Sequence, residues 1–106
     1  MITAQFFIDR NDRITGFHIS GHSDLAESGQ DILCAFVSSA AYMTANTITD
    51  VIGANAAAQD DDGDMKVTVA ENDLEACQVI LAGMKLHLIE TEKQYPENVK
   101  VIMTEV

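Results

Sequence analysis

Apolar residues in segment 31–52 recur at steps of three and four, the spacing of one face of a long helix. Such a helix buries its apolar side only against a sheet or another helix, so it demands a second layer. Gly53 is expected to end it, because glycine is common just past the end of a helix. The expected buried stripe is Ile32, Phe36, Ala40, Met43, Thr47 and Val51, widened by Leu33, Val37 and Ile48.

A second helical pattern lies nearer the C-terminus. We expect Asn72 or Asp73 to cap it and Pro96 to stop it. Its apolar stripe is Leu74, Cys77, Leu81, Met84 and Leu88. Cys77 on this stripe is expected to be a core residue, since free cysteine is among the most buried residue types.

The other patterned segments alternate with period two, as half-buried strands do. They are residues 2–8, 14–20, 65–70 and 99–104. Segment 54–64 consists mainly of small and acidic residues without periodicity, and it is expected to be a loop. The predicted order is therefore ββαβαβ, an α/β fold of the α+β type: a two-layer sandwich with a four-stranded sheet and two long helices on one face.

Length and charge limit the function further. A chain of 106 residues is expected to form one domain, residues 1–106. It carries 17 acidic residues against 6 lysines and arginines, a net charge of -11, which disfavours nucleic-acid binding and favours a basic protein partner. Two cysteines without a signal peptide predict free thiols in a cytoplasmic protein, and no apolar run is expected to span a membrane.

The chemistry is expected between the second strand and the first helix. His22 follows the strand directly after Gly21, and Cys34 is expected in the first turn of the helix, with Asp31 as the N-cap. There the helix dipole favours thiolate over thiol, and an imidazole on the facing loop can exchange a proton with it. The pattern predicts a Cys-His nucleophile pair, with backbone N–H groups at the helix start as oxyanion donors.

Several of these residues have other possible roles. Cys34 could be a buried structural thiol, and Asp31 could orient His22 in addition to capping the helix. The hydroxyl of Ser38, one turn after Cys34, could contact substrate or the thiolate, or bond the carbonyl of Cys34 itself. His18, His22 and Cys34 match no zinc-ligand spacing, so neither a metal nor a cofactor is predicted.

The loop resembles the ribosomal-processing cysteine proteases of the Prp family. The likeness extends to the two opening strands, a segment of the second helix and the turn before the last strand, so it covers essentially the whole chain. The matching residues are Gly21-His22, Ala26-Glu27, Gly29-Gln30-Asp31, Cys34-Ala35, Ala82-Gly83-Met84 and Tyr95-Pro96.

This resemblance implies a homodimeric cysteine endopeptidase that acts in ribosome assembly. Its substrate would be the N-terminal extension of a basic large-subunit ribosomal protein, number twenty-seven in the standard series. Cys34 would be the nucleophile, His22 its acid-base partner, and Asp31 and Ser38 auxiliary residues. The flexible loop bounded by Gly21 and Gly29 would act as a lid.

Two other functions remain open from the sequence. The chain could be a non-catalytic acidic module that binds a basic ribosomal or assembly protein, for which Cys34 would be dispensable. It could also be a redox sensor that works through Cys34 alone.

Overall fold

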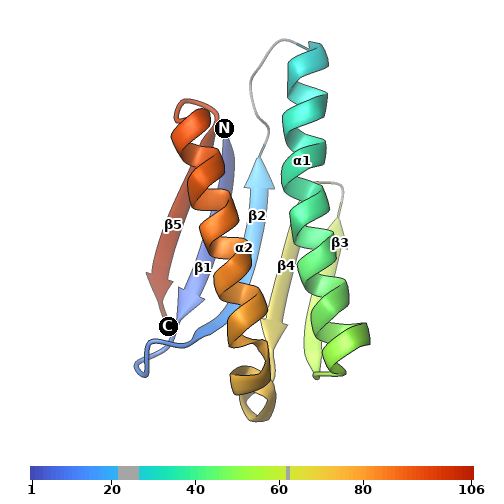
Figure 1. Ribbon diagram of the computed structural model, residues 1–106, viewed down its shortest axis with the longest axis vertical. Helices are drawn as coiled ribbons and strands as arrows, with labels where there is room; N and C mark the ends of the chain where they lie inside the picture. The colour runs from blue at the N-terminus through green and yellow to red at the C-terminus, as the bar shows by residue number, and fades with distance from the viewer. Residues whose placement is uncertain (22–26, 62) are drawn as a thin grey trace.

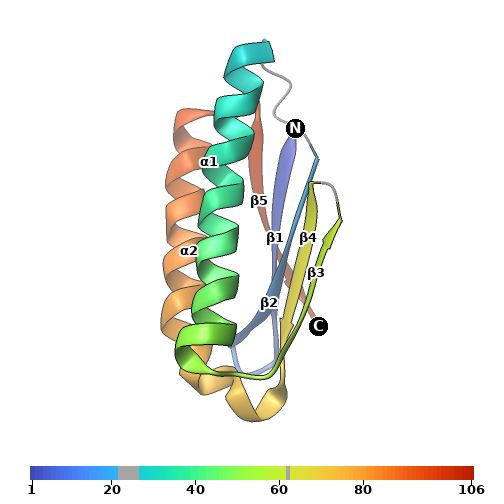
Figure 2. The same ribbon diagram turned by 90° about the vertical axis from the view of Figure 1, so that its right-hand side faces the viewer.

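The protein, described here from a computed structural model, has a five-stranded mixed sheet covered on one face by two long helices (Figures 1 and 2). The structure describes residues 1–21, 27–61 and 63–106, and the side chains of residues 27–31 lie outside this description. The helices are α1 (Glu27–Asn46) and α2 (Leu74–Gln94). The strands are β1 (Ile2–Ile8), β2 (Ile14–Gly21), β3 (Ala56–Asp61), β4 (Asp64–Val69) and β5 (Val99–Glu105).

Across the sheet the strands run in the order β3-β4-β2-β1-β5. Strands β1 and β5 are parallel, and the other neighbouring pairs are antiparallel. The two-layer arrangement matches the sequence prediction, but the predicted count of four strands is wrong. The additional strand, β3, lies in the segment that was expected to be a loop.

The sequence pattern does not predict strand β3, because this strand lies at the exposed edge of the sheet. It is an edge strand with mostly exposed side chains, and its sequence, Ala-Ala-Ala-Gln-Asp-Asp, carries no apolar alternation. Its pairing with β4 uses backbone groups, from Ala56 opposite Val69 to Asp61 opposite Asp64. Strand β3 therefore forms through backbone hydrogen bonds, which leave no side-chain pattern in the sequence.

The core between the layers follows the period-two pattern of the central strands. Phe6 of β1 and Phe17 of β2 stand opposite each other, fully buried, with ring centroids 6.4 Å apart. The predicted stripe of α2 is confirmed, because all five of its residues are buried. Asp73 precedes this helix but does not cap it; its carboxylate accepts a hydrogen bond from the backbone N–H of Asn55 at 2.9 Å.

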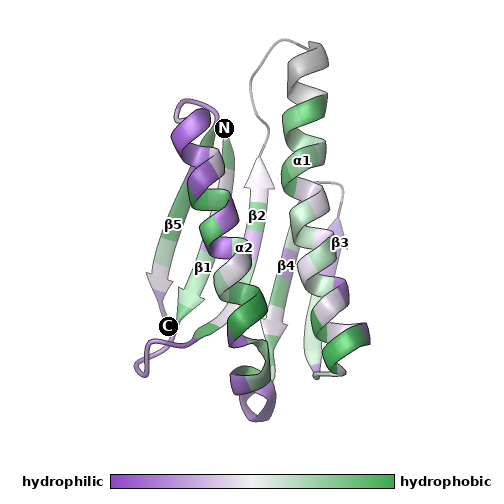
Figure 3. Ribbon diagram, viewed as in Figure 1, coloured by the Kyte–Doolittle hydropathy of each residue, from purple (hydrophilic) through white to green (hydrophobic). Residues whose placement is uncertain are grey.

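The buried face of α1 differs in part from the predicted one. Ile32, Phe36 and Met43 are 72%, 47% and 53% exposed. Leu33, Val37 and Ile48, which were predicted to widen the stripe, are buried as expected. The buried face continues through Ala41, Thr44 and Ala45, about one position along the chain from the centre of the predicted stripe. Apolar residues lie on both the buried and the exposed side of this helix, and Figure 3 shows apolar stretches along much of it, so periodicity alone could not select the face. A π-helical turn, η1 (Thr47–Ile52), extends it to Gly53, whose φ of 76° confirms the predicted glycine stop.

One stretch, Ile32–Ile52, is long and apolar enough by length and composition to cross a membrane, contrary to the expectation from the sequence. It packs one face on the sheet through Leu33, Val37 and Ile48. The core helix of a soluble protein satisfies the same criterion, so this stretch by itself is weak evidence for a membrane location.

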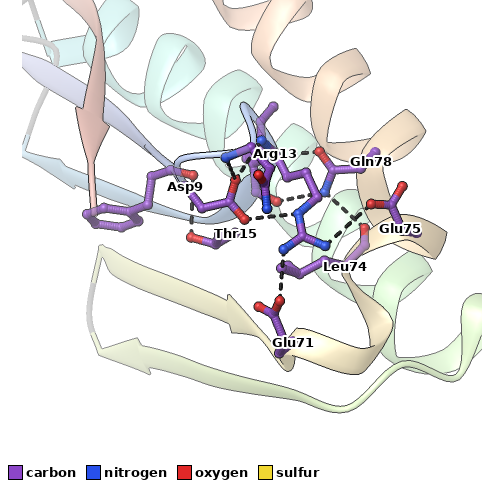
Figure 4. Close-up of polar contacts among 10 residues, drawn as sticks. Asp9, Arg13, Thr15, Glu71, Leu74, Glu75 and Gln78 are labelled. Carbon is purple, nitrogen blue, oxygen red and sulfur yellow. Dashed lines mark hydrogen bonds and ion pairs between the residues drawn. The ribbon is translucent and has the colours of Figure 1, made fainter.

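Arg13 joins the turn between β1 and β2 to the beginning of α2 (Figure 4). Its guanidinium contacts Asp9 at 2.9 Å and Glu71 at 2.8 Å, with Glu75 at 3.4 Å. Hydrogen bonds from the backbone and side chain of Arg13 lower the pKa of Asp9. Gln78 adds two bonds to the backbone of Ile14, accepting from its N–H and donating to its carbonyl, both at 2.8 Å. These contacts fix the end of the sheet at which β1 ends and β2 begins.

Candidate active site

Cys34 and Ser38 open into one cavity at the other end of β2. Both side chains are half-buried on α1, one helical turn apart. The cavity has a volume of about 170 Å³. Its lining residues are Ile2, Ile19, Gly21, Cys34, Val37, Ser38 and Gly63. A nucleophilic thiol and a hydroxyl therefore share an opening at the place where the sequence predicted the chemistry.

Gly21 ends β2 at the edge of this cavity. Its φ is 89°, and a Cβ there would lie 2.1 Å from the carbonyl oxygen of Met1. Both the left-handed backbone and the close approach of β1 require glycine at this position. Gly21, the residue immediately before His22 in the sequence, thus lines the same cavity as Cys34.

His22 itself lies outside the described residues, and so does the side chain of Asp31. The structure brings Cys34, Ser38 and Gly21 together. The roles of His22 and Asp31 stay predictions.

Helix α1 begins at Glu27, earlier than the predicted start near Asp31. Gly29 therefore lies inside the helix and does not bound a loop, and Asp31 is not its N-cap. The polar run before Ile32 concealed this start, because it has no apolar periodicity and because glycine disfavours a helix by only about 1 kcal/mol.

The earlier start changes the surroundings of Cys34, which now stands about two turns into the helix. The dipole effect fades within the first turn, and the N–H groups of Cys34 and Ala35 are used by hydrogen bonds within the helix. The expectation that the helix start activates the thiol and supplies the oxyanion donors is therefore wrong for this structure.

The hydroxyl of Ser38 distinguishes it from the threonines of the helices. Thr44, Thr47 and Thr91 each donate to the carbonyl four residues back, at 2.7 to 2.9 Å. Within the described part of the chain, no such bond joins Ser38 to the carbonyl of Cys34. The Ser38 hydroxyl is thus available to a group that enters the cavity.

Cys77, the second thiol, is 0% exposed in the core under α2. Burial, together with the nearby charge of Asp73, raises the pKa of this thiol and disfavours the nucleophilic thiolate. The prediction of a structural role for Cys77 is confirmed. In residues 1–21, 27–61 and 63–106, no three His, Cys, Asp or Glu side chains gather closely enough to hold a metal ion.

Sequence analysis did not foresee the part that Gly63 plays in the cavity. This residue lies between β3 and β4, has a φ of 88°, and was assigned to a loop. Only the pairing of β3 with β4 folds this segment back toward Cys34. The acidic-Gly run after a non-periodic stretch was the available hairpin signal.

The sequence is similar to known proteins over most of its length. The sequence model of the family described as cysteine protease Prp matches residues 1–100. The chain is 27% identical over 103 residues to the ribosomal processing cysteine protease Prp of Staphylococcus aureus strain Mu50, covering 95% of this chain and 97% of that protein. It is 29% identical over 107 residues to the Prp of Bacillus subtilis strain 168, with 95% and 96% covered.

Two solved structures of the S. aureus essential ribosomal processing protease Prp share the fold. The complex with a covalently linked product peptide gives a TM-score of 0.88 at 26% identity, covering 98% of this chain and 100% of that one. The complex with a substrate peptide gives 0.86 at 25% identity, with the same coverage. The chain belongs to the Prp family of cysteine proteases and is a cysteine-type peptidase.

Proposed function

We propose that this protein is an endopeptidase that removes the N-terminal extension of a large-subunit ribosomal protein, number twenty-seven in the standard series. The observation that carries the proposal is the cavity shared by Cys34 and Ser38, bordered by the residue that precedes His22. The relatives from S. aureus and B. subtilis are ribosomal processing proteases by name, which supports a ribosomal substrate.

The proposed reaction is a two-step acyl transfer. The thiolate of Cys34 attacks the scissile carbonyl, and His22, after taking the thiol proton, returns a proton to the departing amine. Water then hydrolyses the thioester and frees Cys34. Ser38 donates its hydroxyl hydrogen to the substrate or to the thiolate, and Asp31 is an auxiliary residue.

The acidic surface supports a basic client. With a net charge of -11 the protein attracts a ribosomal protein and repels RNA, so we infer that the client is bound through its protein part. Such a substrate places the enzyme in the cytoplasm, where ribosomal proteins are made.

We further propose that the active enzyme is a homodimer, as the family resemblance implies. The exposed apolar side chains of Ile32, Phe36 and Met43 on α1 support this, because monomers rarely leave such a surface uncovered. Light scattering coupled to size-exclusion chromatography measures the mass directly; a mass of one chain at micromolar concentration would contradict the dimer.

Mass spectrometry of the digestion products tests the substrate assignment. The protein is incubated with the extended ribosomal protein and, separately, with an equally basic ribosomal protein that lacks such an extension. We expect one cut near the N-terminus of the first protein and none in the second. Equal cutting of both proteins, or of neither, would contradict the proposed function.

A further inference from the structure

The turn between β3 and β4 forms one wall of the cavity that contains Cys34. Gly63 in this turn lines the cavity together with Cys34 and Ser38. A Cβ added at Gly63 would meet nothing within 4 Å, so the turn borders open space. The position of the turn consequently sets the room available to a peptide beside the thiol.

On the side of the sheet that faces the helices, Tyr42 contacts the hairpin next to this turn. Tyr42 of α1 donates its hydroxyl hydrogen to the carboxylate of Asp60, near the end of β3. Asp60 stands opposite Met65, whose side chain is buried under the helices, so the contact lies on the helix-facing side of the hairpin. The Asp60 carboxylate raises the pKa of Tyr42, so the hydroxyl keeps the proton that makes the bond.

On the opposite side of the sheet, His18 contacts the same hairpin. The Nε2–H of His18 on β2 donates to the carboxylate of Asp64, the first residue of β4, because a carboxylate can only accept. His18 stands opposite Lys66, which alternates with the buried Met65 and Val67 and therefore faces away from the helices. The two contacts thus bind the hairpin on both of its faces, close to Gly63.

We propose that these two contacts fix the β3–β4 turn as a wall of the peptide-binding cavity, which makes Tyr42, Asp60, His18 and Asp64 positioning residues. This inference rests on the proposed function of Cys34. Strand β3 is an edge strand whose single neighbour in the sheet is β4, so contacts from outside the sheet are needed to fix its position firmly. Without the contacts the turn would have to be ordered by the substrate, at the expense of binding free energy.

Two conservative variants test the proposal. Tyr42→Phe removes only the hydroxyl that Asp60 accepts from, and Asp64→Asn removes the charge that His18 contacts. With a synthetic peptide of the proposed N-terminal extension, we expect each to raise KM about 3- to 10-fold at nearly unchanged kcat. The rate at which iodoacetamide alkylates Cys34 should not change, because this small reagent does not depend on contacts with the β3–β4 turn.

Each variant has a matched control. Tyr95 is 41% exposed against 45% for Tyr42, and its hydroxyl has no hydrogen-bond partner in the described part of the chain, so Tyr95→Phe removes an unused hydroxyl. Asp61→Asn removes a charge from the same hairpin; across the described ranges the Asp61 side chain has no bonded partner. Both controls should keep KM within about twofold of the wild type, the range of a surface change without a structural role.

A third variant keeps both contacts and changes only the wall. Asn tolerates a positive φ, so Gly63→Asn should fold, narrow the cavity and raise KM. Unchanged KM in Tyr42→Phe, Asp64→Asn and Gly63→Asn would overturn the proposal, even if the melting temperature fell. An equal KM increase in the controls would also overturn it. Failure of the wild type to cleave would instead reject the proposed function, a separate outcome.

Discussion

Cys34 and Cys77 are the same side chain in two different surroundings. Cys34 is half-buried beside a cavity, whereas Cys77 is fully buried and its pKa is raised by burial. Nucleophilic chemistry needs an accessible thiolate, so we predict that Cys34 carries the chemistry, whereas Cys77 packs in the core. The sequence already indicated this division, since Cys77 belongs to the apolar stripe of α2 and Cys34 follows a glycine-rich polar run.

Removal of Cys77 should affect stability and not cleavage. Cys77→Ala leaves a small cavity in the core, which we expect to lower the free energy of unfolding by about 1–2 kcal/mol. Urea unfolding followed by circular dichroism measures this, with peptide cleavage assayed in parallel. Loss of cleavage by a folded Cys77→Ala protein would contradict the structural role.

The Cys77 thiol also predicts a pH dependence. Because its pKa is raised in the folded state, the folded protein holds the proton after the unfolded chain has lost it. The stability contribution is therefore complete below the ordinary thiol value of 9.0 and is lost as the pH rises above it. In Cys77→Ala this decline above pH 9.0 should be smaller; an identical decline in both proteins would show that other groups cause it.

Ser38 is predicted to assist catalysis without being essential. Ser38→Ala should reduce kcat/KM by about 10- to 1000-fold, the range for loss of one hydrogen-bond donor to a developing charge. Ser39→Ala, the exposed neighbouring serine, is the control and should retain full activity. An unchanged kcat/KM in Ser38→Ala would reduce Ser38 to a lining residue.

Among the secondary-structure elements, those with strong and one-sided patterns were predictable. The stripe of α2, the strands β1, β2, β4 and β5, and the stop at Gly53 are where the sequence places them. The face of α1 was not, because Ile32 and Leu33 are equally apolar and only contact with the sheet distinguishes them. Strand β3 and the first turns of α1 were not predicted, because neither segment has an apolar pattern.

The same limits apply to the site. Cys34 and Ser38 could be paired from the sequence because one helical turn separates them, and they do share a cavity. Gly63 was not added, because it reaches this cavity through the pairing of β3, a strand without an apolar pattern whose one sequence signal is the acidic-Gly turn after it. Long-range backbone pairing is thus the missing information.

At the far end of the sheet, Gln78 links α2 to the β1–β2 turn. Gln78→Ala leaves the backbone N–H and carbonyl of Ile14 without their partners, which should cost about 1–3 kcal/mol of unfolding free energy. Cleavage should persist, because the Cys34 cavity lies at the opposite end of β2. Gln94→Ala on the same helix is the control, since the Gln94 side chain has no hydrogen bond within the described residues; equal destabilisation by both would contradict this role of Gln78.

For the whole molecule, the net charge of -11 is the dominant property. A basic substrate approaching an acidic enzyme is accelerated at low salt, and this attraction is screened as ionic strength rises. We expect kcat/KM for the basic substrate to fall steadily between about 20 and 500 mM NaCl. A neutral peptide with the same cleavage site is the control; equal salt dependence of both peptides would show that charge does not guide binding.

The central claim is that Cys34 is the nucleophile of a peptidase. Its most direct test compares the wild type with two matched variants, Cys34→Ala and Cys77→Ala, by mass spectrometry of the extended ribosomal protein after incubation. We predict a single N-terminal cut by the wild type and by Cys77→Ala, and an intact substrate with Cys34→Ala. The same cut made by a folded Cys34→Ala protein would contradict the claim.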